Sequence, residues 1–214
     1  MAQLTLDQGL ALLEKRARIT RWLLFAFMIF ALLTMCVSIG EASGAIEMEG
    51  EALGSAEMAA AFIYIVYLIA LLAAIVSVST WIYRAHANLH AAGFEDLRYT
   101  PGWAVGWYFV PFANLFKPFE AMRELWNSST ANAVDTDHDG HLGPWWGSWI
   151  LGNILSNIGA RMQGSSVPEM ISVGYVVDTL GGIGLIAAAF FLAQIVRKVT
   201  AAQGSVMGIA EVFA

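Results

Sequence analysis

Long apolar runs separated by polar segments dominate the pattern of this chain. Four runs are long enough to cross a bilayer, at residues 22–39, 59–83, 145–160 and 170–196. A helix rises about 1.5 Å per residue, so roughly 20 residues cover the ~30 Å hydrocarbon core. The third run is the shortest and most polar of the four. The pattern predicts an all-α integral membrane protein with four transmembrane helices, built as a single membrane domain over residues 1–214.

Residues 1–21 show helical periodicity instead of a continuous apolar run. One face of the helix would carry Leu6, Leu10, Leu13 and Ala17. Thr5 and Gln8 have the spacing of a capping box, in which each side chain satisfies the other's backbone N–H. We expect an amphipathic N-terminal helix that lies on the membrane surface and leads into the first span.

The segment 101–132 is apolar at first but interrupted. Pro111 and Pro118 break it, and a proline inside a helix removes a backbone hydrogen bond and clashes with the preceding turn. If the segment does not cross the membrane, every lysine and arginine except Arg161 lies on one side, which the positive-inside rule assigns to the cytoplasm. We therefore expect a re-entrant or interfacial amphipathic segment on the cytoplasmic side, with both termini cytoplasmic.

Composition supports a membrane protein and excludes several classes of site. Hydrophobic residues make up 58% of the chain and charged residues only 13%, whereas soluble domains are about one-quarter charged. The single cysteine, Cys36, excludes an internal disulfide and cysteine metal clusters. The sequence contains no phosphate loop, nucleophile elbow, dinucleotide fingerprint or basic run for nucleic acid. Membrane lipid and other membrane subunits, or further copies of this chain, are the expected partners.

The central third of the chain carries a distinctive arrangement of tryptophan, proline and asparagine. The stretches are WIYRAHANLHAAG at 81–93 and YTPGWAVGWYFVPFANLFKPFEAMRELW at 99–126. The positions that match are Trp81, Arg84, Asn88, Pro101, Gly102, Trp103, Trp107, Pro111, Asn114, Leu115, Pro118, Arg123 and Trp126. In these positions the chain resembles the bacterial membrane family known as domain of unknown function 4328. The resemblance implies a multi-span bacterial protein and brings no reaction, because the family has none assigned.

Polar residues within and beside the broken segment suggest a pocket. Its candidate residues are Arg84, Asn88, Trp103, Trp107 and Asn114. The two asparagines can each cap exposed backbone groups, and Arg84 can donate to carbonyls freed by a proline. The pocket is either a site for a lipid or small amphiphile or a structural brace, since polar residues in membranes often only hold helices together.

An aspartate-rich loop precedes the third span. Asp135, Asp137 and Asp139 match the first three ligand positions of a calcium loop, and His141 would contribute its backbone carbonyl. The twelfth position, which should be a glutamate, is Trp146. Calcium is therefore one interpretation of the loop, and a solvated acidic turn is the other.

Two histidines, His86 and His90, are four residues apart and share a helix face, which suits a metal. The glutamate that a metalloprotease needs after the first histidine is Ala87 here, so the alternative is two polar residues near the headgroups.

Two functions remain open from the sequence. We expect a non-enzymatic accessory or scaffold subunit of a bacterial inner-membrane complex, because catalytic residues are not evident and small residues line the last two spans. The alternative is a membrane enzyme or transporter that acts on a lipid or small amphiphile through Arg84, Asn88 and Asn114.

Overall fold

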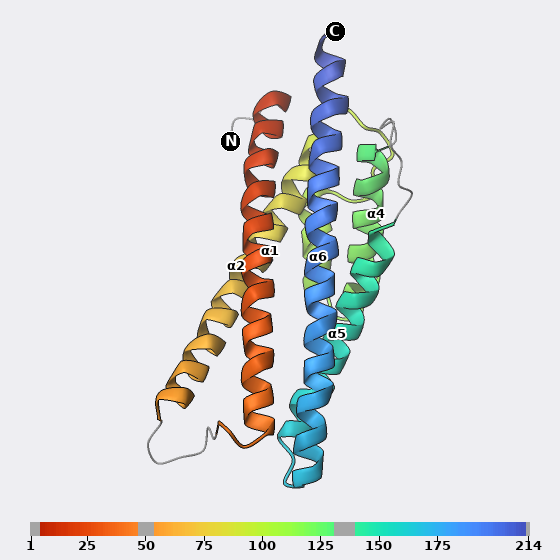
Figure 1. Cartoon of the computed structure of the whole chain (residues 1–214). Coiled ribbons are helices and arrows are strands. Elements are labelled where there is room, and N and C mark those ends of the chain that lie inside the picture. Colours follow the sequence, from red (N-terminus) through yellow and green to blue (C-terminus); the bar gives the residue numbers. More distant parts are fainter. Residues whose placement is uncertain (1–4, 47–53, 131–139, 213–214) are drawn as a thin grey trace. The chain divides into compact units, whose positions relative to one another are not determined.

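All of the secondary structure described in the computed structural model is helical (Figure 1). The structure describes residues 5–46, 54–130 and 140–212. The α-helices are α1 (Leu6–Ala42), α2 (Ser55–Ala91), α3 (Pro101–Gly106), α4 (Lys117–Thr130), α5 (Leu142–Gln163) and α6 (Pro168–Val212). Two short 3-10 helices, η1 (Trp107–Phe109) and η2 (Ala113–Leu115), lie between α3 and α4.

Three helices are long and apolar enough to cross a membrane, namely α1, α2 and residues 168–205 of α6. This makes the chain a multi-pass membrane protein by the length and composition of its helices. The helix α5, which contains the expected third span at 145–160, is 22 residues long but is not among the three. Its glycines, asparagines and serines lower its hydropathy, as the sequence already indicated.

The N-terminal region and the first expected span belong to one helix, and the position of the N-terminal region on the membrane surface stays a prediction. Residues 6–42 form one continuous helix of 37 residues, α1, with no break near residue 21. No proline interrupts this stretch, so its backbone hydrogen bonds continue past the basic residues. The capping box at its start is confirmed: the Thr5 N–H donates to Gln8 Oε1 at 3.2 Å, and the Gln8 N–H donates to Thr5 Oγ1 at 3.4 Å.

The contacts divide the chain into two compact units, and each is described by itself. The first unit contains residues 1–22, 75–144 and 191–214, and the second contains residues 23–74 and 145–190. The single membrane domain stays a prediction.

The core of the first unit combines apolar side chains with polar contacts between helices. Leu13, Leu89, Leu125 and Val199 are almost fully buried. Thr20 and Ser77 join α1 to α2 through hydroxyl groups 2.7 Å apart. The indole N–H of Trp81, a fully buried residue, donates to Thr200 Oγ1 at 3.1 Å. Trp81 therefore braces α2 against α6 within the unit.

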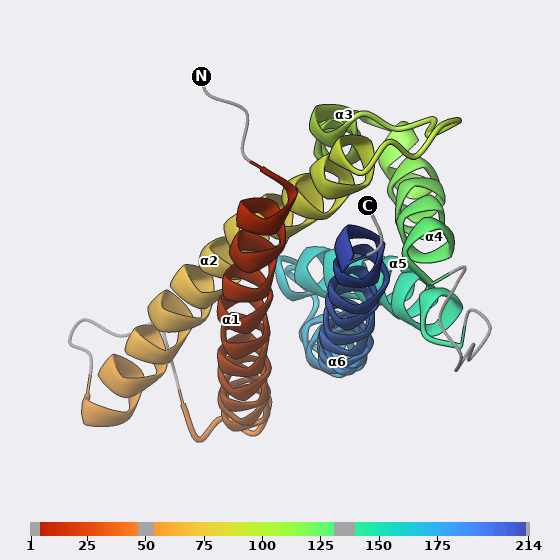
Figure 2. The same ribbon diagram turned by 90° about the horizontal axis from the view of Figure 1, so that it is seen from above.

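A glycine in a left-handed conformation ends α2. Gly93 has a φ of +77°, and the Gly93 and Phe94 N–H groups donate to the His90 and Leu89 carbonyls. Glycine adopts this left-handed conformation without steric cost, which allows the chain to leave the helix sharply. Beyond it, the chain turns into α3 and returns through η1 and η2 to α4 (Figure 2).

In the second unit, glycines bring α5 and α6 into backbone contact. A Cβ atom at Gly159 would lie 2.6 Å from the Asp178 nitrogen, and one at Gly181 would lie 2.6 Å from the Ser156 nitrogen. Both distances are shorter than any tolerated contact, so only glycine fits at these crossings. The small-residue faces of the last two spans are thus used within the chain.

Candidate functional site

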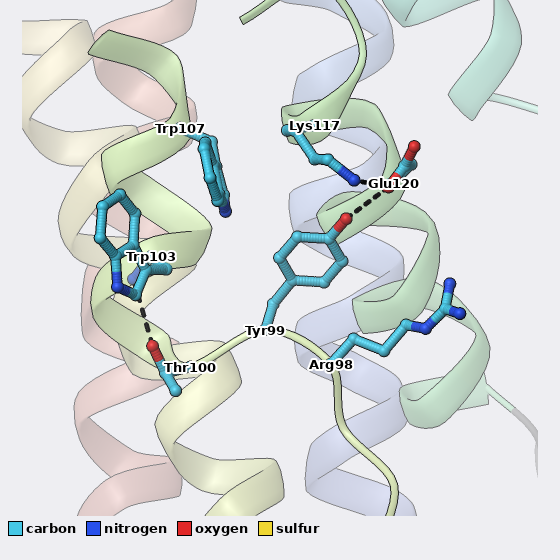
Figure 3. Close-up of a pocket in the computed structure, with 7 residues that line it drawn as sticks. All are labelled: Arg98, Tyr99, Thr100, Trp103, Trp107, Lys117 and Glu120. Atoms are coloured by element: carbon cyan, nitrogen blue, oxygen red, sulfur yellow. Dashed lines mark hydrogen bonds and ion pairs between the residues drawn. The ribbon is translucent and has the colours of Figure 1, made fainter. Parts of the chain in front are cut away.

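A pocket of about 420 Å³ lies in the first unit, between the start of α3 and the start of α4 (Figure 3). Its lining residues are Arg98, Tyr99, Thr100, Trp103, Trp107, Lys117 and Glu120. Figure 3 shows the two tryptophans on one wall and the charged side chains on the other, with Tyr99 between them.

The aromatic wall follows from the local sequence of α3. Thr100 precedes the helix, and its hydroxyl accepts a hydrogen bond from the Trp103 N–H at 3.4 Å. Pro101 then occupies the first turn, where a missing N–H costs nothing. Trp103 and Trp107 are four residues apart, so they project from the same side, with ring centroids 4.8 Å apart and planes inclined by 34°.

The polar wall is a hydrogen-bonded cluster. The Lys117 ammonium donates to Glu120 Oε2 at 2.7 Å, and the Tyr99 hydroxyl donates to the same oxygen at 2.5 Å. One turn further along α4, the Glu124 carboxylate accepts the backbone N–H groups of Arg98, at 2.8 Å, and Tyr99, at 3.1 Å. These bonds hold the loop before α3 against α4 and so fix the pocket's width.

The cluster fixes the charge of its members near neutral pH. The hydrogen bond from Lys117 and then that from Tyr99 lower the pKa of Glu120. Glu120 in turn raises the pKa of Lys117, while burial and then the bond to Glu120 raise the pKa of Tyr99. With Arg98 added, the pocket carries two cations and one anion, which favours a negatively charged ligand group.

We expect this cluster to contribute stability that disappears in acid. A carboxyl pKa lowered in the folded protein stabilises the fold above its usual value of 4.5. That contribution is lost as the pH falls through the lowered pKa. The melting temperature of the wild type should exceed that of Glu120→Gln at pH 7, and the difference should vanish in acid. A difference that is independent of pH would contradict the assigned role of the carboxylate.

Exposed apolar side chains surround the break between η1 and η2. Phe109 is 70% exposed and Phe112 is 82% exposed. Phe112 also has a φ of +63°, a left-handed conformation that is uncommon for a bulky residue. The proline-broken backbone thus holds aromatic side chains outward, next to the pocket in sequence, while contact of this segment with lipid stays a prediction.

The candidate pocket residues from the sequence fall in different surroundings. Trp103 and Trp107 line the pocket just described, whereas Arg84, Asn88 and Asn114 are not among its lining residues. Asn114 lies in η2 and is half-buried.

Asn88 is fully buried on α2 and belongs to a polar network of its own. Its amide donates to the Gly9 carbonyl and to Gln203 Oε1, both at 3.3 Å. Gln203 in turn donates to the Ala85 carbonyl at 3.1 Å and to Ser129 Oγ at 3.0 Å. A Cβ at Gly9 would lie 2.5 Å from Asn88 Oδ1, so α1 needs glycine there to approach α2. The contacts of Asn88 are those of a brace.

The two histidines of α2 bond to backbone groups. His86 is fully buried, with Nδ1 3.0 Å from the Ile82 carbonyl, and His90 Nε2 lies 3.1 Å from the Tyr99 carbonyl. Across the part of the chain that the structure describes, no three His, Cys, Asp or Glu side chains gather as a metal site.

Of the four predicted calcium ligands, the structure describes only His141. Asp135, Asp137 and Asp139 lie outside the described residues. His141 lies just before α5, half-buried, with its ring centroid 6.1 Å from that of Phe191. Calcium at this loop stays a prediction.

Comparison with known protein families decides the affiliation of the chain. A family model described as "Domain of unknown function (DUF4328)" matches residues 45–201. The chain belongs to the DUF4328 family. The match contains all of α2 to α5 and every residue that lines the pocket, so the pocket lies within the DUF4328 region. Among curated proteins and among solved structures, nothing matches this chain.

Several residues of this DUF4328 site were not identified from the sequence. Tyr99, Glu120 and Glu124 are among them, although Lys117 and Glu120 have the i, i+3 spacing of a helical ion pair. Gln203 was missed because it lies far along the chain from its partner Asn88, and a single sequence contains no signal for that contact.

Proposed function

We propose that this protein is a non-enzymatic membrane protein that binds the headgroup of an anionic phospholipid in the pocket between α3 and α4. The observation that carries the proposal is the pairing of two adjacent, mutually tilted tryptophan rings with an excess of positive charge across one pocket of about 420 Å³. This retains the amphiphile alternative from the sequence but assigns it to a different set of polar residues.

The chemistry of the two walls suits a molecule with unlike ends. Arg98 is exposed and forms no ion pair within the described residues, so its guanidinium can bind a phosphate in bidentate fashion. Lys117 adds a second cationic donor, although its ion pair with Glu120 neutralises part of its positive charge. Trp103, 55% exposed, gives the apolar part of a lipid a flat surface at headgroup level.

Native mass spectrometry of the full chain in detergent tests the proposal. We expect phosphatidylglycerol to remain bound to the wild type, and Arg98→Gln to weaken this binding by about fivefold. Arg18→Gln is the matched control, because it removes an exposed arginine of the same unit that lies outside the pocket.

Equal retention by Arg98→Gln and the wild type would overturn the assignment. Equal retention of phosphatidylcholine would instead show that the headgroup charge is not recognised.

We further propose that α5 is the fourth span and that both termini face the cytoplasm of a bacterial inner membrane. Its 22 residues give about 33 Å, enough for the hydrocarbon core. The Asn153 and Asn157 amides each donate to a carbonyl one turn earlier, Trp149 and Asn153, at 2.8 Å. Their donors are thus partly satisfied inside the helix, which lowers the cost of placing them in lipid.

Cysteine labelling tests this topology. In a Cys36→Ser background, Lys15→Cys tests the N-terminal side and Arg197→Cys tests the C-terminal side. Both positions are exposed, whereas Gln203, nearer the C-terminus, is buried. With four spans, Lys15→Cys and Arg197→Cys should both resist a membrane-impermeant reagent in intact cells. Labelling of only one of them would show an odd number of crossings.

The accessory-subunit interpretation loses one of its arguments. The glycine faces that suggested a partner helix are occupied by α5 and α6 themselves. Purification in mild detergent followed by mass spectrometry still tests it: a co-purifying subunit in fixed proportion would support this role alongside lipid binding.

A further inference from the structure

A second pocket, of about 300 Å³, lies entirely within the second unit. It is formed by α1, α2, α5 and α6, and its polar lining includes Ser38, Tyr64, Tyr67, Asn157, Asp178 and Thr179. Three of these four helices are the candidate membrane spans. Burying polar groups among apolar helices costs free energy, so polar groups that line such a cavity indicate a binding function.

The charge of this pocket is negative and uncompensated. Asp178, half-buried on α6, lines it and forms no ion pair with any lysine or arginine that the structure describes. Glu41 is not a lining residue, but its carboxylate accepts a hydrogen bond from the hydroxyl of the lining residue Tyr64 at 3.0 Å. The residues that line the pocket include no lysine, arginine or histidine.

Packing fixes the position of the carboxylate. Gly159 of α5 crosses α6 at Asp178, and a Cβ there would lie 2.8 Å from the Asp178 Cα. The backbone that carries the carboxylate is therefore held by a close helix crossing and not by a flexible loop. The ring of Tyr67, another lining residue, packs against Phe27 with ring centroids 5.7 Å apart. An acidic side chain on a fixed backbone and a supported aromatic ring thus line the same cavity.

We propose that this pocket binds a small organic ammonium ion. Asp178 would supply the counter-charge, the Tyr64 and Tyr67 rings would contact the cation through their faces, and Ser38, Asn157 and Thr179 would accept or donate hydrogen bonds. A bare metal ion fits less well, because a volume of about 300 Å³ exceeds one ion and the described residues gather no set of three metal-ligating side chains. This site is independent of the lipid pocket between α3 and α4.

Isothermal titration of the purified full chain in detergent with choline tests the proposal. The neutral isostere 3,3-dimethylbutan-1-ol has the same shape without the charge. We expect choline to bind and the isostere not to bind. Asp178→Asn should weaken choline binding by about tenfold or more, because the counter-charge is removed. Glu169→Gln is the control, since it removes an exposed acid of the same helix outside the pocket and should leave the affinity unchanged.

A second pair of variants protects the test against misfolding of Asp178→Asn. Tyr67→Phe keeps the ring and should retain binding, whereas Tyr67→Leu removes it and should weaken choline binding by several fold, on the order of a lost cation–π contact. Equal binding of choline and its isostere, or no binding of choline to the wild type, would overturn the proposal. Binding of sodium alone would also overturn it, because the site would then take an inorganic ion.

Discussion

Gly159→Ala should destabilise the protein more than any other glycine-to-alanine substitution in α5. The new Cβ would lie 2.6 Å from the Asp178 nitrogen and 2.8 Å from its Cα, both backbone atoms that cannot rotate away. Relieving such overlap means separating α5 from α6, at a cost of about 3 kcal/mol. Thermal unfolding in detergent, followed by circular dichroism, should show a melting temperature lower by roughly 10 °C.

The control lies on the same helix. Gly147 also belongs to α5, but a Cβ there would meet nothing within 4 Å. Alanine is the better helix former, by about 1 kcal/mol in an exposed position, so Gly147→Ala should leave the protein as stable as the wild type or slightly more stable. If Gly159→Ala and Gly147→Ala have the same melting temperature, close packing of α5 on α6 does not contribute to stability.

Asn88→Ala is expected to have the second-largest effect. The substitution removes the donor that joins the Gly9 carbonyl on α1 to Gln203 Oε1 on α6. It leaves a buried glutamine oxygen without a partner and a small cavity beside it, at a cost of about 2 kcal/mol. A lower melting temperature with unchanged phosphatidylglycerol binding would identify Asn88 as a structural residue.

Asn114→Ala provides the comparison, because Asn114 is half-buried and lies in a short 3-10 helix. Its loss should shift the melting temperature little. Should Asn88→Ala instead keep full stability and lose lipid binding, the pocket expected from the sequence would regain its support.

The long helices could be predicted because a segment that spans lipid must be a continuous run of about 20 mainly apolar residues. Apolar runs at 22–39, 59–83, 145–160 and 170–196 each fall inside a helix of the structure. A local signal was equally informative: the Thr5 and Gln8 cap depends only on neighbouring residues. The proline break predicted a disrupted helix, and the chain indeed divides there into α3, η1, η2 and α4.

Helix ends within polar sequence could not be predicted. Hydropathy stops being informative where lysine and arginine begin, although the backbone of α1 continues through them. The burial of Trp81 and Trp145, at 0% and 3% exposure, could not be predicted either, because tryptophan is also enriched at membrane interfaces. An aromatic ring suits either place, and only tertiary packing distinguishes them.

Only part of the pocket could be predicted, because sequence shows local spacing but not contacts between distant segments. Trp103 and Trp107 share a face by their spacing alone, so the sequence revealed them as neighbours. Arg84 and Asn88 were assigned to them because they are polar and close along the chain. Their true partners are on distant segments: Gly9 on α1 and Gln203 on α6 for Asn88. Contacts of that range follow from how helices pack and have no local signature.

The helix α1 is too long to lie in the hydrocarbon core alone, so part of it is expected in lipid and part in water. Its 37 residues span about 55 Å, nearly twice the ~30 Å of hydrocarbon available to it. Deuterium should therefore enter its amides slowly over one stretch and faster over another.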